Sequence, residues 1–135
     1  MAPKYLLFPR EEIMSRLSGT ESDLQRRVWL IGKQNAEKSF GAVFTRRRRG
    51  DLETQQWAHH DDEEVEFIVA GRMVVQIGSK EEGVVDQFEA GAGDMFCIPA
   101  GVKHRADAIG DELCIGVLFC PVAYDLTTGQ PFFRS

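Results

Sequence analysis

Residues 57–71 (WAHHDDEEVEFIVAG) constrain the fold of this chain more than any other part of its sequence. Two histidines, His59 and His60, stand next to four consecutive carboxylates, and a β-branched and aromatic run follows from Val65 and stops at Gly71. Such a run predicts a strand, because these side chains fit a pleated, half-buried surface. Metal-binding side chains directly beside a buried strand suggest a metal ion at the mouth of a β-structure.

His60 and Glu64 are four positions apart, which is about 13 Å along one straight strand. Ligands lie only about 2 Å from their metal ion, so both residues can bind one ion only if the chain turns between them. A helix would also bring them together, but the strand-like residues that follow argue against a helix. The sequence therefore predicts that one strand ends near His60 and the next begins near Glu64. Asp61, Asp62 and Glu63 are expected to form a solvated turn.

A second stretch, from Gly93 to Ala108, contains a short apolar strand that Pro99 and Gly101 end, with His104 three residues later. In the cupin family the second motif is G, five residues, P, one residue, G, two residues, H, three residues, N. Gly93, Pro99, Gly101 and His104 fit this motif, and Ala108 stands where asparagine is usual.

The first cupin motif is HxH, three or four residues, E, six residues, G. His60, Glu64 and Gly71 fit it, and Ala58 takes the place of the first histidine. The sequence thus resembles the cupins over roughly residues 40–120.

This resemblance implies an all-β fold, a double-stranded β-helix or jelly-roll barrel. It also implies one divalent transition metal ion (Fe, Zn, Ni or Mn), held by a facial triad of His60, Glu64 and His104 that leaves positions open for a substrate. Beside these ligands the family's geometry places Phe96 and Ile98 toward the cavity. Further candidates for the substrate pocket form a short list: Trp57, Phe67 and Tyr124.

The chain has 135 residues, which is the size of one domain, and its 13 glycines and 9 phenylalanines without a long apolar run are typical of a turn-rich β protein. We expect residues 28–120 to form the barrel and residues 121–135 to form a tail that packs on it. Residues 1–27 are expected to form an N-terminal extension with a short helix at 11–17 and a polar link at 21–27. The strand-like residues 5–8 have few obvious partners, and in small cupins such a strand often pairs with another subunit, so the resemblance implies a homodimer.

Charge and composition exclude several classes of protein. A net charge of −5 argues against a general nucleic-acid binder. No segment approaches the ~20 apolar residues that a membrane span needs. The N-terminus lacks the long apolar core of a signal peptide, and the three cysteines form no CxxC motif. We therefore expect a cytoplasmic protein with reduced thiols that binds neither nucleic acid nor membrane.

Residues 46–49 are four consecutive arginines. They could form an anion site, but a charge run without glycine-rich backbone donors rarely makes a pocket. We therefore expect a solvated loop or an edge strand protected by its charge. After them, residues 52–60 are expected to form the strand that carries the histidines.

His59 is out of phase with position 58, because successive side chains of a strand point to opposite faces. A β-bulge would turn His59 inward, and bulges are common beside active sites. An inward His59 would be either a fourth ligand or the catalytic general base, and an outward His59 would be replaceable.

The implied function is a metal-dependent enzyme on a small organic molecule, of the lyase, isomerase or cyclase type. The ion would polarise a carbonyl or carboxylate, and His59 or a metal-bound hydroxide would move the proton. An iron-dependent dioxygenase would use the same triad. The alternative from another class is a cupin that binds a small ligand without turnover, which the missing histidine at position 58 favours.

Overall fold

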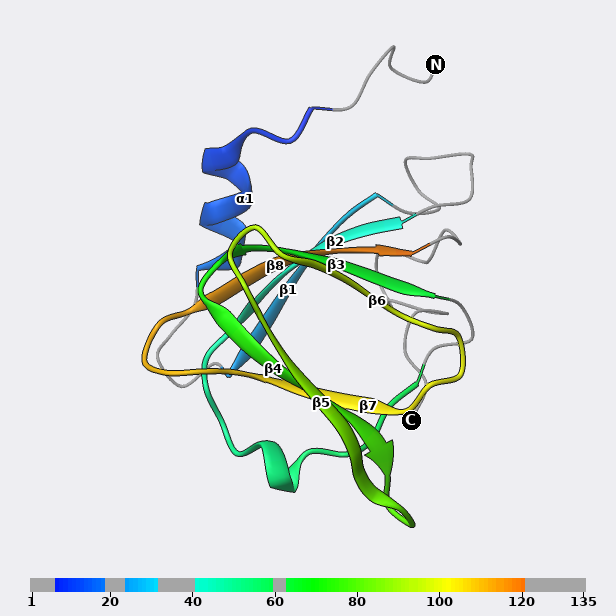
Figure 1. The fold of residues 1–135 in the computed structure, drawn as a ribbon. Coiled ribbons are helices and arrows are strands. Elements are labelled where there is room, and N and C mark those ends of the chain that lie inside the picture. Colours follow the sequence, from blue (N-terminus) through cyan, green and yellow to red (C-terminus); the bar gives the residue numbers. More distant parts are fainter. Residues whose placement is uncertain (1–6, 19–23, 32–40, 60–62, 121–135) are drawn as a thin grey trace.

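The computed structural model describes residues 7–18, 24–31, 41–59 and 63–120. In chain order these residues form α1 (Arg10–Leu17), β1 (Gln25–Ile31), β2 (Gly41–Arg47), the 3-10 helix η1 (Leu52–Thr54), β3 (Glu64–Ala70), β4 (Arg72–Ser79), β5 (Gly83–Gly91), β6 (Met95–Ile98), β7 (His104–Ala108) and β8 (Cys114–Cys120). Strands dominate, as the composition predicts, and α1 lies beside them (Figure 1).

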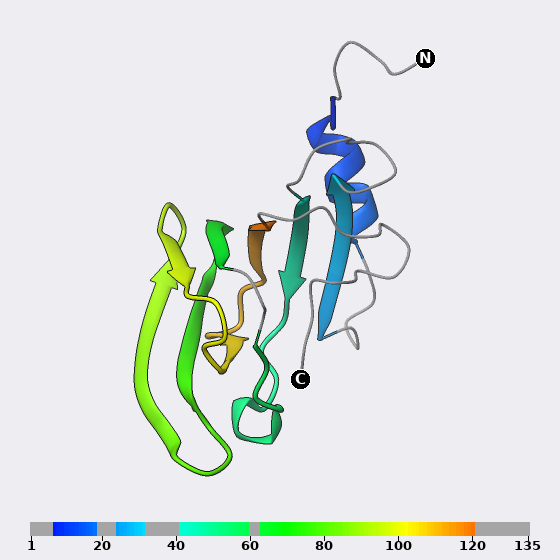
Figure 2. The same cartoon turned by 90° about the vertical axis from the view of Figure 1, so that its right-hand side faces the viewer.

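The strands form two antiparallel sheets that face each other (Figures 1 and 2). The larger sheet has the order β1-β2-β8-β3-β6, and the smaller sheet has the order β5-β4-β7. Neighbours in a sheet are often distant in the chain; β8, for example, pairs with β2 on one side and with β3 on the other. Facing antiparallel sheets with these connections form a jelly roll, so the predicted all-β barrel is confirmed.

The apolar core lies between the two sheets. Most of it gathers where β3 and β7 end and where β8 begins, while Ile98 lies opposite Glu64 at the beginning of β3. Its buried members are Ile68, Met73, Val75, Ala90, Ile98, Ala108 and Cys114. Burial of each large side chain among them stabilises the fold by roughly 1.5–3 kcal/mol. The other ends of β3 and β7, where these strands begin, carry polar side chains instead and therefore leave room for a site.

Helix α1 covers the outer face of the larger sheet. Leu17 is 1% exposed and packs in one cluster with Val28 and Leu30 of β1. Side chains point alternately to the two faces of a strand. The face of β1 opposite Val28 and Leu30 carries Arg27 and is turned toward the space between the sheets. The short helix predicted at residues 11–17 is confirmed and begins one residue earlier, at Arg10.

Three local expectations differ from the structure. The polar link expected up to residue 27 ends sooner, because β1 already begins at Gln25. Within the described part of residues 5–8, Leu7 and Phe8 form no strand, and Phe8 packs against the helix cluster. In the described part of the strand expected at residues 52–60, the chain forms the short helix η1 and then an isolated bridge at Ala58. The helix forms because the Asp51 carboxylate accepts a hydrogen bond from the backbone N–H of Glu53 at 3.2 Å.

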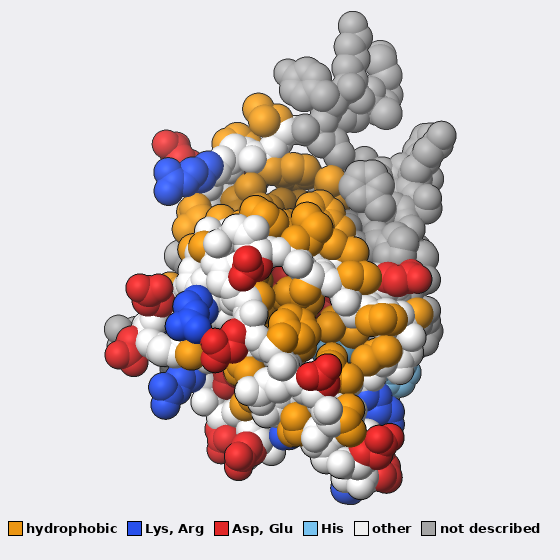
Figure 3. All heavy atoms as spheres, viewed as in Figure 1, with side chains coloured by type: hydrophobic (Ala, Val, Ile, Leu, Met, Phe, Trp, Pro, Cys, Tyr) orange, Lys and Arg blue, Asp and Glu red, His pale blue; other side chains and the backbone are white. Residues whose placement is uncertain are grey.

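Hydrophobic side chains gather over the face that carries β5 and β6 (Figure 3). Exposed members of these strands include Val84, Val85 and Met95. Among the described residues, no helix combines the length and the apolar composition that a membrane crossing needs.

Candidate functional site

Strand β3 carries two buried carboxylates on the face that looks between the sheets. Glu64, Glu66 and Ile68 alternate with less buried neighbours and are 6%, 1% and 0% exposed. This alternation is typical of a strand with one buried face. On β3, however, the first two buried positions carry carboxylates instead of apolar side chains. Buried carboxylates need cations or hydrogen-bond donors, so the surroundings of Glu64 and Glu66 define the site.

His104 reaches the same space from β7. The turn before it is closed by a hydrogen bond from the Val102 N–H to the Pro99 carbonyl at 3.2 Å, and Gly101 adopts a φ of 78° there. This positive φ explains why the motif has glycine at position 101. Two backbone hydrogen bonds, at 3.0 and 2.8 Å, then pair His104 with Ala58. The chain therefore runs beside β7 at position 58 and belongs to the opposite sheet from position 64; Asp61 and Asp62 of the expected turn lie outside the described residues.

Glu64 and His104 form a close pair. The Nε2 of His104 lies 3.0 Å from the Oε2 of Glu64, and its Nδ1 lies 3.0 Å from the Val102 carbonyl, to which it donates. Burial lowers the pKa of His104, but the hydrogen bond and the charge of Glu64 outweigh burial and raise it above its ordinary value. A proton is therefore held between the imidazole and the carboxylate.

The geometry of this pair fits two ligands of one metal ion. Two ligands at right angles, each about 2.1 Å from an ion, lie about 3.0 Å apart, which matches the separation of Nε2 and Oε2. The Nδ1–H bond to Val102 turns the Nε2 of His104 toward Glu64, and binding of an ion would displace the proton that the pair shares. No group of three His, Cys, Asp or Glu side chains is close enough to hold a metal among the described residues, and His60, the third predicted ligand, lies outside them.

Arg47 and Glu66 form a buried ion pair behind this site. The Arg47 Nη1 lies 3.0 Å from the Glu66 Oε1, and their side chains are 14% and 1% exposed. Burial lowers the pKa of Arg47, but Glu66 and Glu64 outweigh burial and raise it, so the guanidinium stays charged. Burial raises the pKa of Glu66 despite the opposing charge of Arg47. Gly116 makes the arrangement possible, because a Cβ there would lie 2.8 Å from the Glu66 Oε1.

A cavity of about 140 Å³ lies between these groups. Its lining is mostly polar and consists of Gln25, Arg27, Arg47, Gln55, Gln56, Ala58, Glu64, Glu66, Val75, Phe96, His104, Arg105, Ala106 and Leu118. Burial, then Arg47, lower the pKa of Arg27 to about 10, although Glu64 acts in the opposite direction. The cavity therefore combines a carboxylate–imidazole pair with cations and is suited to a polar, charged ligand.

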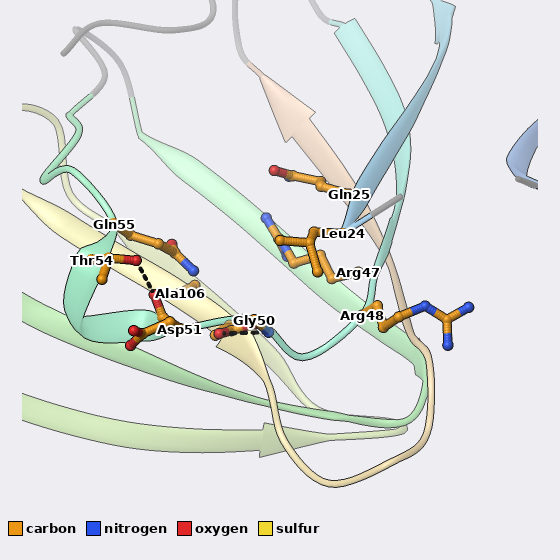
Figure 4. Close-up of a pocket in the computed structure, with 10 residues that line it drawn as sticks. Leu24, Gln25, Arg47, Arg48, Gly50, Asp51, Thr54, Gln55 and Ala106 are labelled. Carbon is orange, nitrogen blue, oxygen red and sulfur yellow. Dashed lines mark hydrogen bonds between the residues drawn. The ribbon is translucent and has the colours of Figure 1, made fainter. Parts of the chain in front are cut away.

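A second hollow of about 290 Å³ adjoins this cavity and shares four lining residues with it. Gln25 and Arg47 extend toward Gln55 across it, whereas Arg48 points away (Figure 4). The loop at its edge is held by the Gly50 N–H, which donates to both carboxylate oxygens of Asp107 at 3.0 and 3.1 Å. Because of the shared lining, this hollow gives access to the cavity from the side of β1 and β2.

The predicted pocket residues divide into two groups. Phe96 lines the cavity, as expected, and its ring packs edge-on against Phe88. Ile98 is on the same strand but belongs to the apolar core, and Phe67 alternates with Glu66 and so lies on the opposite face of β3. Trp57 is outside the cavity, where the Arg105 guanidinium stacks 4.2 Å from its ring centre.

The remaining predicted residues are only partly described. Ala58 lines the cavity, and His59 is half-buried and is not part of that lining. The Nδ1 of His59 is buried and makes no hydrogen bond within the described residues. His60 and Tyr124 lie outside the described residues. The role of His59 stays a prediction.

Sequence reasoning missed the cations of the site. The expectation that residues 46–49 are solvated is wrong for Arg46 and Arg47, because Arg46 is 4% exposed and Arg47 binds Glu66. A signal was present: Glu64 and Glu66 share a face with apolar Ile68, and buried acids require partners. Arg27 carried no such signal in the sequence.

Comparisons with known proteins agree with this architecture. The family model described as "Cupin domain" (Cupin_2) matches residues 50–119. An uncharacterized Streptomyces coelicolor protein, SCO3923, is 31% identical over 62 residues, which are 46% of this chain and 53% of that protein, so the chain spans about half of its length.

Two solved structures illustrate the fold similarity. Bacillus subtilis oxalate decarboxylase, in a study of its Mn(II) centres, has a TM-score of 0.63 and 18% identity, over 78% of this chain and 28% of that one. KdgF from Halomonas sp. has a TM-score of 0.56 and 18% identity, over 76% of this chain and 85% of that one. At these identities the likeness concerns the fold. Since the family model covers more than half of the sequence and the barrel is a jelly roll, the chain belongs to the cupin domain family.

Proposed function

We propose that the protein is a metal-dependent enzyme that acts on a small organic substrate, with chemistry of the lyase, isomerase or cyclase type. The observation that carries the proposal is the pair of Glu64 and His104, 3.0 Å apart in the wall of a polar cavity. We assign His60 as the third ligand. The ion would be a divalent Fe, Zn, Ni or Mn, and the Mn(II) centres of Bacillus subtilis oxalate decarboxylase support this assignment by analogy of fold.

Each side chain has a distinct part in this proposal. A bound ion would supply a Lewis acid that polarises a substrate carbonyl or carboxylate. Glu64 contributes the negative charge of the ligand set, and Val102 keeps the Nε2 of His104 aimed at it. Phe96 covers the apolar side of the substrate.

Proton transfer is assigned to His59. It directly follows Ala58, which lines the cavity, and its Nδ1 makes no hydrogen bond within the described residues; the assignment requires the ring to turn toward the cavity. A metal-bound water is the alternative proton carrier, and the His59→Ala variant described below separates the two.

A metal titration tests the ligand assignment. Metal-free wild-type protein is titrated with Mn²⁺, Fe²⁺, Ni²⁺ and Zn²⁺ under anaerobic conditions, beside Glu64→Gln and His104→Ala. The matched control is Glu63→Gln, which makes the same change at an exposed neighbouring position. We expect one ion per chain in wild type and control, and an affinity about 100-fold weaker or worse in both ligand variants, since loss of even an outer partner costs about 10- to 100-fold. Equal affinity in wild type and Glu64→Gln would overturn the assignment.

A cupin that binds a small ligand without turnover is the second candidate. It is favoured by Ala58, because a methyl group lines the cavity where the first cupin motif has a histidine ligand. Absence of stoichiometric metal in wild-type protein, together with binding of a small ligand by the metal-free form, would support this candidate instead.

A further inference from the structure

Residues 50–58 lie along one edge of β7, and their last part forms a wall of the cavity. β7 is the last strand of the smaller sheet and pairs with β4 on its other side. The segment is attached to β7 at both ends, first by the bonds from the Gly50 N–H to the Asp107 carboxylate, and then by the two backbone bonds between Ala58 and His104. Between these ends it forms the helix η1 and no strand, so its position there depends on side chains of β7.

Arg105 attaches the middle of this segment to β7 (Gln55 is labelled in Figure 4). Its Nη1 donates to the Glu53 carbonyl at 3.2 Å and to the Gln55 carbonyl at 3.4 Å. Its Nε donates at 2.8 Å to the side chain of Gln76, whose own amide donates at 2.9 Å to Gln87 on β5. A row of side chains across the smaller sheet thus orients the guanidinium, which reaches the segment in a fixed position.

Trp57 provides another contact between Arg105 and the segment. The guanidinium carbon of Arg105 lies 4.2 Å from the centre of the Trp57 ring, an arrangement in which the cation and the ring attract each other. The ring also packs close to the buried Gly78 on β4, where a Cβ would lie 3.1 Å from the ring carbon Cη2. Glycine at position 78 therefore leaves room for the ring to pack on the sheet, directly before Ala58.

We infer that Arg105 is a positioning residue of the site, which clamps residues 53–57 against β7 and so keeps Ala58 paired with His104. Position 58 lines the cavity, and the next residue is His59, to which proton transfer is assigned, so a shift of this segment changes the spacing across the site. The clamp acts through the direction of its hydrogen bonds, because a planar guanidinium can donate to several acceptors at once. Its consequence for metal binding rests on the proposed function, but the clamp itself can be measured in metal-free protein.

Hydrogen exchange of metal-free protein, followed by mass spectrometry, tests the clamp. Arg105→Lys keeps the charge but places all its donors on one atom, and Arg105→Met keeps an unbranched side chain without charge. Arg72→Gln is the matched control, because it removes an arginine from an exposed ion pair on the neighbouring strand. We expect exchange of the Ala58 amide to be about 10-fold faster in both Arg105 variants and unchanged in the control, since hydrogen bonds from a charged donor contribute at least about this factor. Equal exchange in wild type and both Arg105 variants would overturn the clamp.

Metal binding gives a result whose sign separates positioning from charge. Metal-free protein titrated with Mn²⁺ should show an affinity about 10-fold weaker in both Arg105 variants, because loss of a residue that orients a metal site costs about 10- to 100-fold. If Arg105 acted only through its charge, Arg105→Met would bind Mn²⁺ more tightly, since a neighbouring cation repels the ion, and Arg105→Lys would match wild type. Either of these two results would overturn the positioning role.

A second variant tests the same clamp without a change at Arg105. Gln76→Leu leaves the charge of Arg105 in place and removes the side chain that orients it, so it should accelerate exchange at Ala58 by a smaller factor. The thermal midpoint of each variant shows that it is folded.

The outcomes also separate the clamp from the proposed metal chemistry. If wild type takes up no Mn²⁺, the proposed function fails, whereas faster exchange at Ala58 in the Arg105 variants would still sustain the clamp. If wild type binds Mn²⁺ and exchange at Ala58 is the same in every variant, the proposed function stands and the clamp is refuted.

Discussion

Removal of one partner of the buried ion pair between Arg47 and Glu66 should lower the free energy of unfolding far more than removal of one partner of a surface ion pair. The two charged atoms are 3.0 Å apart and the side chains are 14% and 1% exposed. At an effective dielectric constant of about 20 their attraction is about 5 kcal/mol, and it offsets the cost of taking both charges out of water. Removal of one partner leaves the other charge buried, which typically costs about 3–5 kcal/mol.

The test is a double-mutant cycle with methionine, an unbranched side chain that fills irregular space. Arg47→Met should lower the free energy of unfolding by about 3–5 kcal/mol, and Glu66→Met should lower it less, because Arg47 is the more exposed partner and can regain water. The double variant should lie within about 1 kcal/mol of wild type, since an apolar pair leaves no buried charge.

Urea unfolding of metal-free protein at neutral pH, followed by tryptophan fluorescence and by circular dichroism, gives all four stabilities. Arg26→Gln serves as a charge-removal control on the outer face and should change stability by less than about 0.5 kcal/mol. Single variants that each cost under about 1 kcal/mol, or a double variant less stable than both singles, would refute the reasoning.

Three further predictions concern other parts of the chain. Gly71→Ala should lower the free energy of unfolding in urea by about 3 kcal/mol, and Gly83→Ala should lower it by about 1 kcal/mol. Both glycines have a φ above 70°, but only at Gly71 would a Cβ meet the backbone, 2.9 Å from the Cα of Cys114. Equal losses in the two variants would contradict this explanation. Burial raises the pKa of the Cys114 thiol to about 11, so about one molecule in a thousand is a thiolate at pH 8. Native Cys114 should therefore resist iodoacetamide that modifies exposed Cys97, and peptide mass spectrometry showing equal modification would argue otherwise. His59→Ala should keep its metal and lose turnover; unchanged turnover would make His59 a bystander.

The fold and the pair of Glu64 and His104 could be predicted from the sequence, because both depend on turns whose residues can be recognised there. Pro99 and Gly101 fix a short loop, and His104 follows at a set distance, so its place at the start of a strand depends on few long-range contacts. The acids of β3 share one face by simple alternation. Glu64 and His104 therefore lie together, as the motif spacing indicated.

The cations could not be predicted, because alternation shows which residues share a face and not which face is interior. Arg27 and Arg47 appear solvent-facing in the sequence, since interior strand faces are normally apolar. Strand pairing decides their position: Gln25, two residues before Arg27, lies opposite Arg47, and both strands turn these side chains inward. Trp57 was misplaced for a related reason, because a short helix replaced the expected strand before it.

The match to the family model begins at residue 50, whereas Arg27 and Arg47 lie on β1 and β2, before that point. The cavity thus has two sources in the chain: the matched segment provides the carboxylate, the imidazole and Arg105, and the preceding strands provide Arg27 and Arg47. Strand β1 pairs with β2 alone in its sheet, so its inward side chains can change with little effect on the pairing of the other strands. Ligand preference in a barrel built this way can diverge at one sheet edge while the end that carries Glu64 and His104 is kept. The same edge is the natural place to graft a new specificity.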